Sequence, residues 1–267
     1  MQKFMLITLT IVSLFYLAIC ILAYVLQERL IFFPNHIAVD YRFPFPQPFT
    51  EIFLKASDGK LMHGLYFTTS QSRGVILYLH GNAGALDSWG SVAPTYLSLG
   101  YNVMVVDYRG YGKSQGAITN ESQLLDDVGL FYDHLLKSYR ESDVIVLGYS
   151  LGSGLASQLA ARNNPRMLIM QAPYFNLTAM MKHSVPFLPT FLLKYKLATN
   201  EALPRCRMPI VLIHGDQDEV IPYSQALQLK ELLKPGDTLI TLPGAGHNGM
   251  TDDPAYRNAI KHILQTN

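Results

Sequence analysis

The sequence has few of the residues that mark disulfide-bonded, zinc-binding or nucleic-acid-binding proteins. Its 267 residues include only two cysteines, Cys20 and Cys206, and charged residues make up 15% of the chain and leave a net charge of +1. Two cysteines so far apart, one inside an apolar segment, do not predict an intrachain disulfide. The spacing of Cys and His predicts no zinc site, and we expect no metal. The near-neutral balance gives no sign of a nucleic-acid partner.

Charge is missing altogether from residues 4–26. As a helix these 23 residues would span about 34 Å, against a hydrocarbon core of about 30 Å. The run also lacks the polar face that a core helix usually shows. It therefore predicts an N-terminal transmembrane anchor over residues 1–27. The alternative is a cleaved signal peptide, although no good small-x-small cleavage site follows and residues 17–20 fit a lipoprotein site poorly.

The charges on either side of the apolar run bear on the orientation of this anchor. Lys3 precedes the apolar run, and Arg29 and Arg42 follow it, so the positive charges are nearly balanced. A single N-terminal anchor most often leaves its N-terminus in the cytoplasm, so we expect the rest of the chain in the periplasm or a lumen. Residues 28–49 contain several prolines, which predict an extended linker.

Residues 50–267 alternate short apolar runs with amphipathic stretches. This alternation predicts an α/β domain with a mostly parallel, eight-stranded sheet covered by helices on both faces. A turn at 57–60 joins the first two strands as an antiparallel hairpin. The expected strands are 51–56, 61–68, 75–79, 103–106, 144–147, 167–170, 210–213 and 238–242. The expected helices are 88–99, 121–138, 151–162, 224–233 and 254–264.

Residues 173–209 interrupt this alternation. The segment is rich in proline and in bulky apolar side chains. Its length and composition predict a small helical cap inserted above a site, with an ordinary pair of core helices as the alternative.

A candidate nucleophile follows the run 144–147. Residues 148–152 read Gly-Tyr-Ser-Leu-Gly before a helical stretch, which predicts a sharp turn with Ser150 at its apex. A serine hydroxyl needs a base, itself oriented by a carboxylate. His247 lies in a glycine-rich loop after the last expected strand, and Asp216 and Asp218 follow the strand before it. All would emerge at the carboxyl edge of a parallel sheet, where such folds place their sites.

These segments resemble those of a known superfamily. The order of serine, aspartate and histidine is that of the α/β-hydrolase triad. From about residue 27 onward the chain resembles the membrane-anchored serine hydrolases of the α/β-hydrolase superfamily, which include α/β-hydrolase domain-containing lipases, protein depalmitoylases and bacterial relatives. The resemblance is carried by six ordered segments, 30–34, 80–84, 107–114, 148–152, 214–222 and 246–248.

The resemblance implies roles for particular residues. It makes Asp218, rather than Asp216, the acid of the triad, and it makes the backbone N–H groups of Asn82 and Leu151 the oxyanion hole. No cofactor is implied. His80 is interpreted as support for the loop that carries Asn82.

The implied function is hydrolysis of carboxylic ester or thioester bonds through a Ser–His–Asp triad and an acyl-enzyme. The anchor and the apolar cap favour a small-molecule or lipid-like acyl ester as substrate. A serine peptidase or an acyltransferase on the same fold stays open, as does a catalytically inactive, membrane-tethered binding protein.

Overall fold

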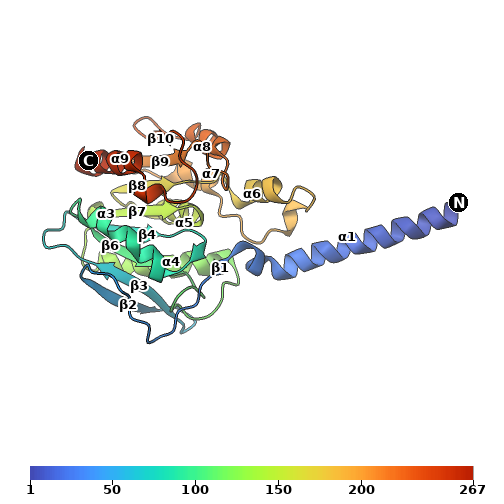
Figure 1. The fold of residues 1–267 in the computed structure, drawn as a ribbon, viewed down its shortest axis with the longest axis horizontal. Helices are drawn as coiled ribbons and strands as arrows, with labels where there is room; N and C mark the ends of the chain where they lie inside the picture. Colours follow the sequence, from blue (N-terminus) through green and yellow to red (C-terminus); the bar gives the residue numbers. More distant parts are fainter. Residues whose placement is uncertain (267) are drawn as a thin grey trace.

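Eight strands form one mixed sheet in the computed structural model, which describes residues 1–266. Their order is β10-β9-β8-β7-β4-β6-β3-β2 (Figure 1). β3 runs antiparallel to both neighbours, and the other five neighbouring pairs are parallel, which confirms the predicted sheet. The strands of this sheet are β2 (Phe49–Lys55), β3 (Leu61–Phe67), β4 (Val75–Leu79), β6 (Asn102–Val106), β7 (Val144–Tyr149), β8 (Met167–Gln171), β9 (Ile210–Gly215) and β10 (Thr238–Leu242).

Helices cover both faces of the sheet, as predicted. Because successive side chains of a strand point to opposite faces, Leu77 of β4 belongs to an apolar cluster shared with α4, α5 and α8. The next residue along the strand, Tyr78, belongs to a second cluster shared with α3 and α9. The helices are α1 (Gln2–Ile31), α2 (Leu86–Trp89), α3 (Ala93–Leu97), α4 (Glu121–Leu136), α5 (Leu151–Ala160), α6 (Leu177–Ser184), α7 (Thr199–Ala202), α8 (Tyr223–Lys230) and α9 (Pro254–Thr266).

The helix expected at 88–99 is the main local difference from the prediction. It is divided into α2, the 3₁₀ turn η1 (Gly90–Val92) and α3. Pro94 lies in the first turn of α3, where its missing N–H costs no hydrogen bond. Gly90 lies so close to the ring of Phe45 that a Cβ there would overlap it. Phe45, from the segment that follows α1, thus packs against the chain at the point where the expected helix is divided.

α1 projects away from the domain (Figure 1). Among the described residues it is the one helix long and apolar enough to cross a membrane, and almost all of its apolar part is exposed. It continues to Ile31, past residue 27 where the anchor was expected to end. Directly after it, β1 (Phe33–Pro34) pairs in parallel with β5 (Ala83–Gly84), so the end of α1 is held against the loop that follows β4.

A small helical cap lies between β8 and β9. Asn176 caps the N-terminus of α6, and its side chain accepts a hydrogen bond from the N–H of Ala179 at 2.7 Å. The 3₁₀ turn η3 (Thr190–Leu192) follows, and α7 with η4 (Leu203–Arg205) leads back to the sheet. In Figure 1, α6 stands apart from the sheet on the side where α1 leaves the domain. The cap and α1 are neighbours, since the side chain of Gln27 on α1 donates a hydrogen bond to the carbonyl of Leu192 in the cap.

Candidate active site

Ser150 occupies a strained turn between β7 and α5. Its φ of 51° and ψ of −117° form a combination that residues with a Cβ rarely adopt. The turn is held by its N–H, which donates to the carbonyl of Gln171, and by its carbonyl, which accepts from Ser153, each at 2.9 Å. A Cβ on Gly152 would overlap the backbone of Leu79, so glycine is required for α5 to approach β4. The Ser150 side chain consequently stands at the N-terminus of α5.

The three residues of the predicted triad lie together. Nε2 of His247 is 3.0 Å from Oγ of Ser150, and Nδ1 of His247 is 2.7 Å from Oδ2 of Asp218. Ser150 follows β7, Asp218 follows β9 and His247 follows β10, so all three lie at the carboxyl edge of the parallel strands. Asp216 instead accepts a hydrogen bond from the N–H of Gly244 at 2.7 Å and braces the loop that carries His247.

Asp218 is held as a carboxylate. Its side chain is fully buried, and burial alone would raise its pKa. Hydrogen bonds from the rings of His214 and His247 and from the N–H of Ile221 outweigh that effect and hold the pKa of Asp218 well below its ordinary value. An ionised Asp218 keeps the proton of His247 on Nδ1, which leaves Nε2 free to accept the proton of Ser150.

The two residues expected to form the oxyanion hole line the same cavity as Ser150. Leu151 is the first residue of α5, whose first N–H groups have no acceptor within the helix. Asn82 lies in the loop between β4 and β5. Both residues line the cavity together with Ser150 and His247. The helix N-terminus favours negative charge at this position, as an oxyanion requires.

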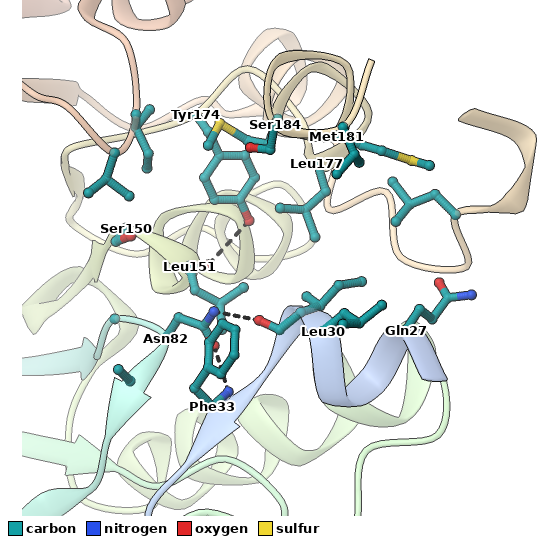
Figure 2. Close-up of a pocket in the computed structure, with 18 of the residues that line it drawn as sticks. Gln27, Leu30, Phe33, Asn82, Ser150, Leu151, Tyr174, Leu177, Met181 and Ser184 are labelled. Atoms are coloured by element: carbon teal, nitrogen blue, oxygen red, sulfur yellow. Dashed lines mark hydrogen bonds between the residues drawn. The ribbon is translucent and has the colours of Figure 1, made fainter. Parts of the chain in front are cut away.

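The side chain of Asn82 ties this loop to the end of α1. Its Nδ2 donates to the carbonyl of Ile31 at 2.5 Å, and its Oδ1 accepts from the N–H of Phe33 at 3.3 Å (Figure 2). The hydroxyl of Tyr111 donates to the same Oδ1 at 2.9 Å. Sequence reasoning assigned no role to this side chain. Segments 30–34 and 80–84 both carry the resemblance to the serine hydrolases, and this was the one signal in the sequence that could have suggested a contact between them.

Buried polar residues also contact the loop that carries Asn82. Nδ1 of His80 lies 2.6 Å from the carbonyl of Gly81, and Nε2 lies 3.4 Å from Oδ1 of Asp107. The hydroxyl of Tyr108 donates to the carbonyl of His80 at 2.5 Å. His80 therefore contacts the loop that it was expected to support. Among residues 1–266, no group of three or more His, Cys, Asp or Glu could hold a metal ion.

A cavity of about 760 Å³ lies above Ser150. Its walls come from α1, from the cap and from the loops that carry the triad, and most of its lining side chains are apolar. None of the described residues that line it is Asp, Glu, Lys or Arg. The lining residues include Gln27, Leu30, Phe33, Trp89, Leu177, Met180, Met181, Val185, Leu188 and Val220.

Known proteins share this fold and parts of this sequence. A family model described as serine aminopeptidase, S33, of the Hydrolase_4 family matches residues 70–201. The Pyrococcus furiosus esterase Pf2001 has a similar structure, with a TM-score of 0.70 and 18% identity over 88% of this chain and 97% of that chain. Est1E from Butyrivibrio proteoclasticus gives a TM-score of 0.64 and 20% identity over 80% of this chain and 98% of its own. The chain has the α/β-hydrolase fold. The predicted resemblance and fold class are confirmed.

The chain also has relatives by sequence. It is 27% identical to the uncharacterized protein Rv2307c of Mycobacterium tuberculosis, over 89% of this chain and 87% of that protein. It is 29% identical to the lysophosphatidylserine lipase ABHD12 of Danio rerio, over 60% of this chain and 47% of the lipase. The chain thus spans about half the length of that lipase. These similarities support the predicted enzyme class, a serine hydrolase of the esterase and lipase type.

Proposed function

We propose that this α/β-hydrolase cleaves carboxylic ester or thioester bonds of lipid-like acyl substrates. The observation that carries the proposal is the hydrogen-bonded series Ser150–His247–Asp218 on the floor of an apolar cavity. Each position holds a side chain that is competent for its role. This argues against a catalytically inactive, membrane-tethered binding protein.

In the proposed mechanism, Oγ of Ser150 attacks the acyl carbonyl carbon while Nε2 of His247 takes the hydroxyl proton. The carbonyl oxygen becomes an oxyanion, which the N–H groups of Asn82 and Leu151 stabilise. Protonated His247 then gives its proton to the leaving alcohol or thiol, and an acyl-enzyme remains on Ser150. Water, with its proton taken by His247, then attacks the carbonyl carbon of the acyl-enzyme. The bond to Oγ of Ser150 breaks, the carboxylic acid leaves, and Ser150 recovers its proton from His247.

The character of the cavity supports an apolar acyl chain as the part of the substrate that is bound. The cavity of about 760 Å³ is as large as typical small-molecule sites. None of its described lining residues is Asp, Glu, Lys or Arg. The names of the ABHD12 relatives describe lipases that act on a single-chain phospholipid. We extend that class of substrate to this chain as part of the proposal.

Peptide hydrolysis is the competing reaction, since the matching family model is named for an aminopeptidase. A carboxylate in the cavity would give the ammonium group of a free amino terminus a strong, charge-assisted hydrogen bond. The described lining supplies none, because Asp218 is buried behind His247 and already takes four hydrogen bonds. Acyl transfer to another alcohol would use the same acyl-enzyme and differs only in the acceptor.

The proposal also places the enzyme at a membrane. The long apolar α1 supports a single-pass anchor. We place the catalytic domain outside the cytoplasm because a single N-terminal anchor most often leaves its N-terminus inside. Protease added to spheroplasts, which expose the periplasmic face of the inner membrane, should then degrade the domain. Protection in intact spheroplasts together with degradation after lysis would place the domain inside and overturn this orientation.

Activity on a series of p-nitrophenyl esters, a thioester and a lysophospholipid tests the proposed reaction. The full-length protein should hydrolyse them, and a chromogenic aminoacyl amide should be a poor substrate. Preferred cleavage of the amide would favour the peptidase. Absence of hydrolysis of every substrate by correctly folded protein would contradict the proposal.

A further inference from the structure

The anchor helix supplies part of the cavity wall. Ala23, Gln27 and Leu30 of α1 line the same cavity as Ser150. In the close-up of Figure 2, Gln27 and Leu30 lie across the cavity from the cap residues Leu177, Met181 and Ser184. A helix that served only to anchor the domain would have no reason to border the catalytic cavity.

The length of α1 allows both roles. Its 30 residues extend for about 45 Å, whereas the hydrocarbon core of a bilayer is about 30 Å thick. About ten residues at its C-terminal end therefore remain for contacts outside the hydrocarbon core. The α1 residues of the cavity wall, Ala23, Gln27, Leu30 and Ile31, lie within this last part.

Polar contacts hold α1 and the cap together. The buried side chain of Gln27 donates to the carbonyl of Leu192 at 3.1 Å and accepts from the N–H of Lys194 at 2.8 Å. Nζ of Lys194 lies 3.1 Å from Oε1 of Glu28. The helix and the cap thus form the two sides of one seam above Ser150.

The cap presents apolar side chains beside the membrane part of the helix. The hydroxyl of Tyr16 donates to the carbonyl of Phe187 at 2.8 Å, so this end of the cap lies next to α1 about seven residues before Ala23. Phe187 and Phe191 are 62% and 84% exposed. They extend the exposed apolar surface of α1, and exposed aromatic side chains at such a place are typical of membrane-contacting surfaces.

We propose that α1 is both the anchor and the outer wall of the acyl site, and that the substrate enters from the bilayer along the seam between α1 and the cap. This inference rests on the proposed function. The substrate is a single-chain membrane amphiphile, whose acyl chain passes Ala23 while its carbonyl reaches Ser150. The identity of the α1 wall residues then sets the preferred acyl length.

The ratio of kcat/KM for p-nitrophenyl palmitate to that for p-nitrophenyl butyrate tests the wall. In full-length protein, Ala23→Trp should lower this ratio by about tenfold, because the indole occupies space needed by the long chain alone. Ala18→Trp is the matched control, since Ala18 is exposed on α1 and does not line the cavity. Equal ratios in the two variants would overturn the wall assignment.

Failure of the proposed function would give a different result. Wild-type protein that cleaved neither ester would refute the hydrolase proposal and with it this inference. Wild-type protein that cleaved both, with the ratio unmoved by Ala23→Trp, would refute only the inference.

Entry from the bilayer is tested with a lysophospholipid in phosphatidylcholine vesicles that contain the full-length enzyme. The double variant Phe187→Ser, Phe191→Ser should lose about tenfold in vesicle activity relative to its activity on soluble butyrate ester. Phe53→Ser is the control, because Phe53 is exposed on β2, away from the cap. A double variant that behaved like this control would exclude entry on this side.

Discussion

The floor and the roof of the cavity are built differently. The floor carries Ser150, Asp218 and His247 on loops at the carboxyl ends of three strands of the sheet, and their side chains are almost wholly buried. The roof consists of α1 and the cap, and no residue of the described helix α6 is buried. The floor takes its geometry from the sheet, whereas the roof is held by contacts between two peripheral elements. The proposed chemistry therefore depends on the core of the fold, and substrate selection depends on its periphery.

The largest expected effect is on the floor, from Ser150→Ala. Without Oγ no acyl-enzyme forms, so kcat on a p-nitrophenyl ester should fall by about 10⁴-fold or more. Ser153→Ala is the control, because Ser153 follows on α5 but lies outside the cavity lining. Steady-state kinetics measures both, and near-wild-type turnover by Ser150→Ala would remove this serine from the mechanism.

A somewhat smaller loss is expected from Asp218→Asn. The amide would favour the wrong tautomer of His247, and kcat should fall by about 10³- to 10⁴-fold. Asp216→Asn should cost far less, since Asp216 contacts Gly244 and not the histidine. If Asp216→Asn were the more damaging change, the assignment of the acid would be wrong.

Asn82→Ala tests the connection between the floor and the end of α1. The variant keeps the backbone N–H but loses the side-chain bonds to Ile31, Phe33 and Tyr111. A looser oxyanion loop should lower kcat by about 10- to 100-fold with little change in KM. Asn35→Ala, at an exposed position after β1, serves as control. A loss confined to KM would point to substrate binding instead.

The two regions should also differ in their contribution to stability. Leu155→Ala removes a fully buried side chain beneath the floor and should cost about 2–5 kcal/mol of unfolding free energy. Met181→Ala, in the half-buried roof, should cost less than about 1 kcal/mol. Denaturant unfolding measures both, and equal losses would mean that the roof is as integral to the core as the floor.

The smallest effect concerns stability in acid. The pKa of Asp218 is lower in the folded protein than its ordinary value near 3.8, so the folded state favours the carboxylate. This stabilisation is complete above that ordinary value and is lost as the pH falls through the lower, folded-state pKa. Melting temperatures from pH 6 to pH 2 should therefore fall less steeply for Asp218→Asn than for wild type. Parallel curves would contradict this role of Asp218.

The sequence predicted the floor better than the roof. The apolar run at 75–79 coincides with β4, and the proximity of Ser150, Asp218 and His247 follows from strands that end at one edge of the sheet. Such features depend on local pattern and on topology. Two features of the roof depend instead on the direction in which α1 leaves the domain. They are the hydrogen bond from Asn82 to the carbonyl of Ile31 and the position of Ala23 in the cavity wall. No periodicity in the sequence encodes that direction.

The division of the expected helix at 88–99 has a similar cause. Its composition is compatible with one continuous helix, but the ring of Phe45 packs against Gly90 and the chain turns there. The partner lies 45 residues earlier, so only the tertiary structure reveals it.

Labelling with a fluorophosphonate probe tests the central claim most directly. The full-length protein should react once, peptide mapping should find the adduct on Ser150, and Asp218→Asn should react much more slowly because its base is misoriented. An adduct on another residue, or an active enzyme that does not react, would contradict the account.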